Sequence, residues 1–333
     1  MSAKWYETQG PEGDVVLSTR IRLARNLSDI PFGVNLDAAG RRQAVNRCSK
    51  AFAQVLPEAK ITEMEAYSAT DAHSLAEKRL ISPEFADREP GTALVLMPDE
   101  TVSVMLCEED HIRLQVMQPG LDLENTWKIA DMIDTAVAAK LPYAFDEQLG
   151  YLTQCPTNVG LAMRASVMLH LPALSQNGAV KRLTENIGKL GMTLRGAFGE
   201  GSAAQASMVQ LSNQMTLGLS ESDALQNLQT VTLQLVEQER RAQAEECRNS
   251  LFTDQIWRAY GILKYARRLE TAEAAKLLSL VRMGACRGVL PVKTETVTAL
   301  LTRIQPAVLE LAEHTHDARE RDEKRAELIR TTI

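Results

Sequence analysis

The feature that most constrains the fold is a set of strand-like segments that place arginines on one side. Residues 14–24, DVVLSTRIRLA, alternate with the period of a strand and put Arg20 and Arg22 on the same face. Residues 164–172, RASVMLHLP, alternate in the same way and begin at Arg164. Surface arginines on strands are common, but several on otherwise apolar strands are costly unless anions meet them. Because guanidinium groups suit bidentate phosphate contact, the pattern predicts a polyanionic ligand such as a nucleoside triphosphate.

A second polar cluster, CEEDHIRLQ at residues 107–115, follows an apolar run. We expect residues 92–118 to form two strands joined by a turn at MPDE, with Glu109, His111 and Arg113 on one face. The structural interpretation is a half-exposed strand with a satisfied ion pair. The functional interpretation is one wall of a reaction site, and the arginine-bearing strands favour it.

The order of the predicted elements indicates an α+β protein. Residues 1–245 mix strands with helices, such as those expected at 38–56 and 125–141, without regular β-α-β alternation. Ser220 and Asp223 resemble a capping arrangement that opens a helix ending at about residue 245. This pattern favours an antiparallel β-sheet flanked by helices.

The rest of the chain, residues 246–333, contains no convincing long strand. Amphipathic patterns predict successive helices at 251–270, 271–284, 294–314 and 315–330. We therefore place a domain boundary near residue 246 and expect a C-terminal α-helical domain.

Composition excludes several classes of protein. The net charge of −6 argues against a nucleic-acid or membrane-surface binder. No apolar run approaches membrane-spanning length, and the first residues contain no signal-peptide core. The five cysteines are scattered, without CxxC or metal-like spacing, so we expect a cytoplasmic protein without a metal site of its own.

Known phosphate-binding motifs are absent from the sequence. It contains no GxxxxGK[ST] segment and no HRD and DFG pair, which excludes a P-loop enzyme and an ordinary protein kinase. Phosphate groups can instead be bound by arginine side chains, without a glycine-rich loop.

Five blocks of the sequence resemble the signatures of the ATP:guanido phosphotransferases, or phosphagen kinases, in that family's order. They are STRIRLARN (18–26), EEDHIRLQ (108–115), GYLTQCPTNVG (150–160), RASVMLHLP (164–172) and RGAFGEG (195–201). The resemblance implies the family's catalytic-domain fold, which is similar to that of glutamine synthetase: an antiparallel sheet flanked by helices.

Within that family the chain is most similar to the bacterial protein arginine kinases. The first block begins at residue 18, so we expect no helical N-terminal domain of the kind found in kinases of small guanidino compounds. The extra C-terminal helices and the segment RDEKRA (321–326) also match this branch.

The resemblance implies roles for individual residues. Arginines would hold ATP and the transferred phosphoryl group, while Glu109 and Glu200 would grip the acceptor guanidinium beside the reactive Cys155. Mg²⁺ would arrive with the nucleotide. The implied ATP-binding residues are Ser18, Thr19, Arg20, Ile21, Arg22, Arg79, Arg113, Arg164, Ala165, Ser166, Val167, Met168, Arg195, Gly196, Ala197, Phe198, Gly199 and Glu200.

The segment RDEKRA places Arg321 and Arg325 at positions i and i+4, on one helix face beside Asp322. A solvated helix surface is the structural interpretation. The resemblance implies an allosteric pocket in which the two arginines bind the phosphate of phosphoarginine and Asp322 binds its guanidinium.

Two positions depart from the family pattern. Where the family has Thr-Gly before the arginine of the fourth block, this chain reads LAMR at 161–164. Arg79 stands where a histidine is expected beside the adenine, although an arginine can also stack on a purine. Neither change removes a charged catalytic group.

The predicted function is transfer of the γ-phosphoryl group of ATP to arginine side chains of proteins, which marks them for regulated degradation during stress. The resemblance also implies a zinc-binding activator protein, a Clp-type ATPase and its stress-repressor client as partners, and a homodimer. Two alternatives are a kinase of free arginine or another small guanidino compound, and a regulatory adaptor whose catalytic site has decayed.

Overall fold

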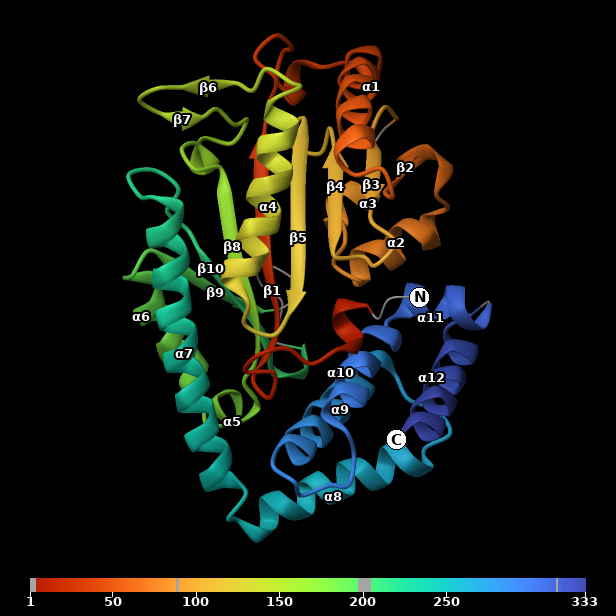
Figure 1. The fold of residues 1–333 in the computed structure, drawn as a ribbon. Helices are drawn as coiled ribbons and strands as arrows, with labels where there is room; N and C mark the ends of the chain where they lie inside the picture. The colour runs from red at the N-terminus through yellow and green to blue at the C-terminus, as the bar shows by residue number, and fades with distance from the viewer. Residues whose placement is uncertain (1–3, 88–89, 197–204, 316) are drawn as a thin grey trace.

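An eight-stranded antiparallel sheet with helices on one face forms the larger part of the molecule (Figure 1). The computed structural model describes residues 4–87, 90–196, 205–315 and 317–333. The strand order is β2-β3-β4-β5-β1-β8-β10-β9. The strands are β1 (Val16–Arg25), β2 (Lys60–Glu63), β3 (Ala93–Leu96), β4 (Val102–Leu106), β5 (Ile112–Pro119), β8 (Met163–His170), β9 (Met192–Gly196) and β10 (Met208–Asn213), with a separate hairpin of β6 (Phe145–Asp146) and β7 (Gly150–Tyr151). The predicted fold class is confirmed.

One face of the sheet packs against α1 (Ala38–Val55), α4 (Leu123–Ala138) and α7 (Glu221–Glu246), as Figure 1 shows. Ile21 and Leu23 of β1 project into this core and are fully buried. Burial of a large aliphatic side chain contributes about 1.5–3 kcal/mol, so this face stabilises the sheet. Arg20 and Arg22 alternate with these residues and project from the opposite face.

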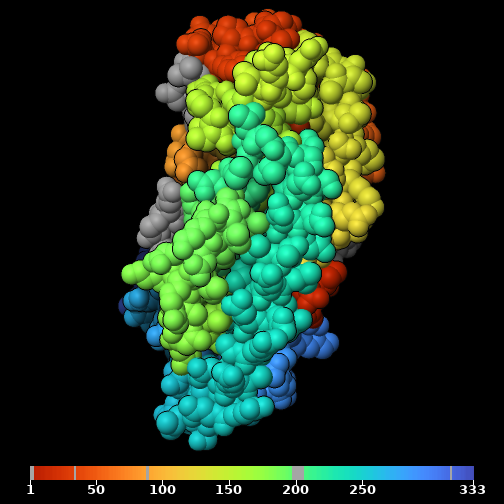
Figure 2. Space-filling view, turned by 90° about the vertical axis from the view of Figure 1, so that its left-hand side faces the viewer, coloured from red at the N-terminus to blue at the C-terminus, as the bar shows by residue number. Residues whose placement is uncertain are grey.

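The helix α7 begins as the sequence predicts. Ser220 accepts a hydrogen bond from the backbone N–H of Asp223, whose carboxylate accepts one in return from Ser220 N. Figure 2 shows α7 and the shorter α6 (Ala179–Gly188) covering the side of the molecule beyond β10.

One detail of α4 differs from the sequence pattern, which places Met132 on the apolar side of the helix. Met132 is 65% exposed, whereas Ala130, Ile133 and Val137 are buried. At 100° per residue Met132 lies more than a third of a turn from the centre of that buried stripe, so its side chain faces solvent.

The segment 92–118 forms three strands, and the prediction of two was wrong. β4 ends at Leu106, and Cys107 adopts a left-handed conformation with φ 59°. A backbone hydrogen bond of 2.9 Å from Cys107 N to His111 O closes the turn before β5 begins at Ile112. The charged residues of the cluster therefore lie mostly in a turn, where each side chain can point in its own direction.

Five helices form the C-terminal region, below the sheet in Figure 1. Their core includes Ile256, Leu278 and Leu300 and continues into the sheet at Met168 and Met208. The segment predicted as one helix at 294–314 is two helices, because proline cannot occupy a helix interior and instead opens the second helix at Pro306. The helices are α8 (Ser250–Tyr265), α9 (Thr271–Cys286), α10 (Thr294–Arg303), α11 (Pro306–Glu313) and α12 (Ala318–Thr332).

The remaining helices are short or lie near the open face of the sheet. They are α2 (Ala69–Glu77), α3 (Pro83–Ala86) and α5 (Pro172–Gln176). Among the residues that the structure describes, no helix has the length and apolar character needed to cross a membrane.

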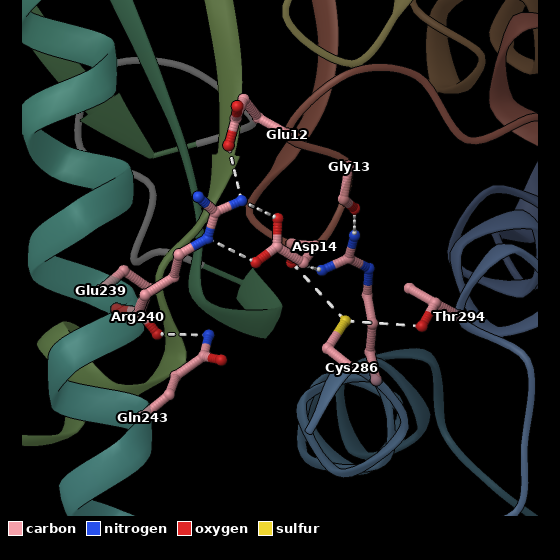
Figure 3. A network of polar contacts seen from close by, with 9 residues as sticks. Glu12, Gly13, Asp14, Glu239, Arg240, Gln243, Cys286 and Thr294 are labelled. Carbon is pink, nitrogen blue, oxygen red and sulfur yellow. Dashed lines mark hydrogen bonds and ion pairs between the residues drawn. The ribbon is translucent and has the colours of Figure 1, made fainter. Parts of the chain in front are cut away.

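A polar network joins the sheet to the C-terminal helices. Arg282 of α9 is buried and donates hydrogen bonds to Gly13 O at 2.7 Å and to Asp14 O at 2.8 Å. The carboxylate of Asp14 forms two hydrogen bonds with Arg240 of α7, at 2.7 and 2.6 Å (Figure 3). Arg282 also donates to Nδ1 of His170, at the end of β8, which leaves the ring proton on Nε2.

The neutral His170 makes stability depend on pH. Burial, and then repulsion by Arg282, holds the pKa of His170 well below its usual value of 6.5. Below about pH 6.5 the imidazole of His170 binds a proton in the unfolded chain but stays neutral in the folded chain. The free energy of unfolding will therefore fall as the pH drops below about 6.5, by up to about 1.4 kcal/mol per pH unit. Urea denaturation between pH 7.5 and 5.5 measures this slope.

The variant His170→Asn will have a smaller slope, because one such contribution is lost while that of His111, whose pKa burial also lowers, remains. The exposed and uncharged Asn186 of α6 provides the control, and Asn186→Gln will keep the wild-type slope. An unchanged slope in His170→Asn would contradict the assignment.

Candidate active site

The open face of the sheet gathers arginines from four strands. In the antiparallel register, Arg22 of β1 lies between Gln115 of β5 and Arg164 of β8, and Arg20 lies opposite Ser166 of β8. The pairing thus places side by side residues that are far apart in the sequence. Further arginines on this side come from β5, β9 and the turn after α2, namely Arg113, Arg195 and Arg79.

These arginines line two adjoining cavities. The larger has an empty volume of about 1230 Å³ and is lined by Arg20, Arg79 and Arg195, among others. The smaller has an empty volume of about 690 Å³ and is lined by Glu109 and Cys155, among others. Both cavities are bounded by the same three arginines, Arg22, Arg113 and Arg164.

Burial and the concentration of positive charge both lower the pKa values of these arginines. Burial, and then repulsion by neighbouring arginines, lowers the pKa of Arg20 to about 9 and that of Arg22 well below its ordinary value. Burial alone lowers the pKa of Arg79 to about 10. The Nε atom of Arg22 is buried and has no hydrogen-bond partner among the described residues. Since guanidinium groups stay protonated near neutral pH, a polyanion in the larger cavity would relieve this repulsion.

Two glutamines, whose roles the sequence analysis missed, orient this cluster. Gln210 of β10 accepts a hydrogen bond of 2.7 Å from Nη2 of Arg20. Gln115 donates to the carbonyl of Arg79 at 2.7 Å and so holds a residue that has a left-handed backbone, with φ 64°. Strand alternation places both glutamines on the arginine face, and that is the signal that could have identified them.

Each residue of the EEDH turn has a separate role. Glu108 forms an ion pair of 2.7 Å with Nη1 of Arg113. Asp110 is buried and accepts hydrogen bonds from Asn26 Nδ2 and Gln154 N, at 2.6 and 2.8 Å. These contacts fix the turn and leave Glu109 lining the smaller cavity.

His111 is a structural residue. Its Nδ1 accepts a hydrogen bond of 3.0 Å from Leu27 N, which leaves Nε2 to donate to Pro31 O at 2.9 Å. Burial lowers its pKa, in keeping with a neutral ring that anchors the turn to the segment after β1.

Cys155 lies on the wall of the smaller cavity, just before a short 3-10 helix (Pro156–Asn158). Its Sγ is 3.0 Å from Oγ1 of Thr157. The hydroxyl of Thr216 donates to the carbonyls of Thr157 and Val159, at 3.0 and 2.8 Å, and so supports the loop from behind. The loop thus carries the sulfur to the same cavity as Glu109.

The other predicted ATP-binding residues are placed differently. Ser18 and Met168 line a third cavity of about 480 Å³ that also reaches Arg79, while Thr19 is buried and donates to Gly120 O at 2.7 Å. Ser166 and Gly196 lie on the arginine side of the sheet. The side chains of Ile21, Ala165 and Val167 project into the core on the opposite face, so these residues could contact a ligand only through their backbone. The predicted residues Ala197, Phe198, Gly199 and Glu200 lie outside the described residues.

The RDEKRA segment lies in α12, in the C-terminal helices. Arg325 is 1% exposed and donates to Ile304 O and Leu269 O, at 2.9 and 2.8 Å, beside an ion pair of 2.6 Å with Asp322. Arg321 forms an ion pair of 2.9 Å with Glu310. The three residues lie in the first half of α12, with Arg325 buried and Arg321 partly exposed.

Ala162, in the LAMR segment, has a left-handed backbone with φ 46°. A side chain is disfavoured there, so Ala162→Gly will raise the free energy of unfolding by about 0.5–1 kcal/mol, the strain relieved less the added flexibility of the unfolded chain. Urea denaturation at pH 7.5 measures the change. As a matched control, Ala136→Gly within α4 will lower stability by about 1 kcal/mol. Equal losses in both variants would show that Ala162 is not strained.

Comparisons with known proteins agree with this geometry. Residues 43–242 match the model of the ATP:guanido phosphotransferase C-terminal catalytic domain, and residues 248–333 match that of the protein-arginine kinase McsB C-terminal domain. The chain is 43% identical to a protein-arginine kinase of Brevibacillus brevis, over 99% of this chain and 95% of that protein. It is 41% identical to one of Caldanaerobacter subterraneus subsp. tengcongensis, over 96% and 97%.

Solved structures show the same relationship. The duplicated taurocyamine kinase of Schistosoma mansoni, with bound components of a transition-state analogue, has a TM-score of 0.62 and 28% identity over 72% of this chain and 34% of that chain. The fold also matches lombricine kinase, with a TM-score of 0.62 and 22% identity over 73% of this chain and 72% of that chain. The family model, the full-length relatives and the arginine-lined site lead to one conclusion: the chain belongs to the ATP:guanido phosphotransferase family.

Proposed function

We propose that the chain is an ATP-dependent protein arginine kinase, which transfers the γ-phosphoryl group of ATP to arginine side chains of proteins. The observation that carries the proposal is the pair of cavities that share Arg22, Arg113 and Arg164. The larger cavity adds Arg20, Arg79 and Arg195 to the shared arginines, whereas the smaller one adds Glu109, so the pair suits an anionic donor and a cationic acceptor. Relatives about 40% identical over the whole chain are named protein-arginine kinases, which supports a protein acceptor.

The larger cavity would hold the triphosphate of ATP, with Mg²⁺ carried by the nucleotide. Phosphoryl transfer passes through a loose transition state, in which charge spreads over the oxygens of the group in flight. The three shared arginines would neutralise that charge at the boundary between donor and acceptor. The base would lie towards Arg79, which lines the larger cavity and also the third cavity that contains Met168.

The smaller cavity would hold the guanidinium of the acceptor. One nitrogen forms the new P–N bond while the bond from the γ-phosphorus to the bridging oxygen breaks, and ADP leaves with that electron pair. A carboxylate must align this nitrogen and take its proton, and we assign that role to Glu109, with Glu200 as the second carboxylate. Cys155, on the wall of the same cavity, would lie beside the guanidinium.

We also propose an architecture and a context for the enzyme. Residues 1–245 would be the catalytic domain, and residues 246–333 a domain that dimerises and docks protein substrates. A zinc-binding activator, a Clp-type ATPase and its stress-repressor client would be partners in a cytoplasmic pathway of regulated degradation. The separate matches of residues 43–242 and 248–333 to two family models support the division into two domains.

An allosteric phosphoarginine pocket at Arg321, Asp322 and Arg325 also belongs to the proposal. Arg321 would exchange its ion pair with Glu310 for the phosphate, while Asp322, now bound to Arg325, would accept the guanidinium. Glu310 also accepts a hydrogen bond of 3.0 Å from Thr70 of α2, so the exchange would reach the helix that precedes Arg79.

Glu109→Gln tests the proposed base. The amide keeps the shape of the side chain but cannot accept the proton, so kcat will fall by about 10²–10⁴-fold while ATP binding is retained. The rate is that of acid-labile phosphate appearing on arginines of a basic protein with Mg-ATP, measured by mass spectrometry. Glu124→Gln, at an exposed position on the opposite face of the sheet, is the matched control and will keep the wild-type rate. A wild-type rate in Glu109→Gln would remove Glu109 from the mechanism.

A comparison of acceptors tests the nature of the substrate. With Mg-ATP, the enzyme will phosphorylate arginines of a folded basic protein much faster than free arginine at the same guanidinium concentration. Production of ADP with each acceptor measures both rates. A faster reaction with free arginine would indicate a kinase of small guanidino compounds, and no ATP turnover with either acceptor would indicate an adaptor.

A further inference from the structure

Glu108 is a buried carboxylate that has no place in the mechanism described above. It is 7% exposed and lies next to Glu109 in the turn between β4 and β5. A carboxylate in such a position is costly unless donors surround it. The groups that donate hydrogen bonds to Glu108 are therefore the ones whose positions it can fix.

Three donors from different segments meet this carboxylate. Its Oε2 atom is 2.7 Å from Nη1 of Arg113 and accepts a hydrogen bond of 2.7 Å from the backbone N–H of Glu109. Its Oε1 atom accepts a hydrogen bond of 2.8 Å from Ser82. A single oxygen thus bridges a residue of the larger cavity and the proposed base of the smaller one.

The contact with Ser82 extends this bridge to the wall of the larger cavity. Ser82 caps α3, because its Oγ also accepts from Phe85 N at 3.3 Å, and it lines the larger cavity together with Arg79. Burial opposes the charge of Glu108, but Arg113 and the hydrogen bonds outweigh it and lower the pKa of the carboxyl below its ordinary value. The group is therefore a charged anchor near neutral pH.

Arg113 needs such an anchor because cations surround it. Its charge contributes to the lowered pKa values of Arg20, Arg22 and Arg164, which shows that the four repel one another. Repulsion would push a flexible, partly exposed side chain towards solvent and away from the boundary of the two cavities. The ion pair with Glu108 opposes that displacement.

We propose that Glu108 is a positioning residue that holds Arg113 and Glu109 in the mutual placement required for transfer of the phosphoryl group. It touches neither donor nor acceptor and acts through these two neighbours. The inference rests on the proposed function, since the placement matters only if a phosphoryl group passes between the two cavities.

Two variants separate the charge of Glu108 from its shape. Glu108→Gln retains an acceptor for Glu109 N and a polar partner for Ser82 but loses the ion pair. Glu108→Ala loses all three contacts. Displacements of about 1 Å can cost about 10²-fold, so we expect kcat to fall by about 10-fold in Glu108→Gln and by about 10²-fold in Glu108→Ala, with the KM for the protein acceptor nearly unchanged. Glu124→Gln is again the exposed control.

A double-mutant cycle distinguishes positioning from a general structural effect. If Glu108 acts through Arg113, then Glu108→Gln will cost less than about 3-fold in kcat when it is made in the Arg113→Ala protein. A merely structural role predicts the same loss in both backgrounds, in step with the melting temperature. The cycle uses the isosteric variant Glu108→Gln, so it can be measured even if Glu108→Ala fails to fold.

Equal losses in the two backgrounds, or a wild-type kcat in Glu108→Ala, would overturn the proposal. Binding of a fluorescent ATP analogue gives a readout independent of transfer. We expect the affinity to be lower in Glu108→Gln than in the wild-type protein, and to be equal in Arg113→Ala and in the double variant. If the wild-type protein phosphorylates no arginine, the proposed function fails. The binding cycle then still shows whether Glu108 places Arg113.

Discussion

The repulsion among guanidinium groups on one face of the sheet is the constraint on which the rest of the structure depends. Arg20, Arg22 and Arg164 are placed together by the pairing of β1 with β8, and each has a lowered pKa because burial and like charge act on it. The face remains folded because the opposite face buries an extensive apolar core. The free energy gained there offsets the cost of holding these charges close together.

The neighbours of these arginines direct the charge without cancelling it. Gln210 and Gln115 are neutral partners, which orient Arg20 and Arg79 and leave their charge available to a ligand. Glu108 partly neutralises Arg113, which lies at the boundary of the two cavities. A glycine-rich loop binds phosphate through backbone N–H groups, whereas here rigid strands and their polar neighbours provide the preorganisation.

The C-terminal helices are bonded to the wall of the larger cavity. The carboxylate of Glu77, at the end of α2, accepts hydrogen bonds from Ala307 N and Val308 N at the start of α11, at 3.1 and 2.9 Å. Arg79 follows two residues later and lines the cavity. A second link is Arg282, which binds the segment before β1. Movement of the helices would therefore be felt where the nucleotide is proposed to bind.

The sequence by itself determined the local features of this protein. Alternation in β1 assigned Arg20 and Arg22 to one face, because side chains alternate strictly along a strand. The capping pattern at Ser220 located the start of α7, since its hydrogen bonds span only three residues. The amphipathic pattern of the last segment of the chain indicated helices, although Pro306 divides one predicted helix into two. These features depend on neighbours in the chain.

Only the tertiary structure decided which distant residues meet. The position of β1 between β5 and β8 brings together Gln115, Arg22 and Arg164, and no local pattern specifies that order of strands. The turn at Cys107 changed the predicted faces, so that Glu108 binds Arg113 while Glu109 lines a cavity. The sequence pattern singled out Glu109 but gave no contact for Glu108. Their roles differ because the direction of a side chain in a turn is set by the donors that surround it.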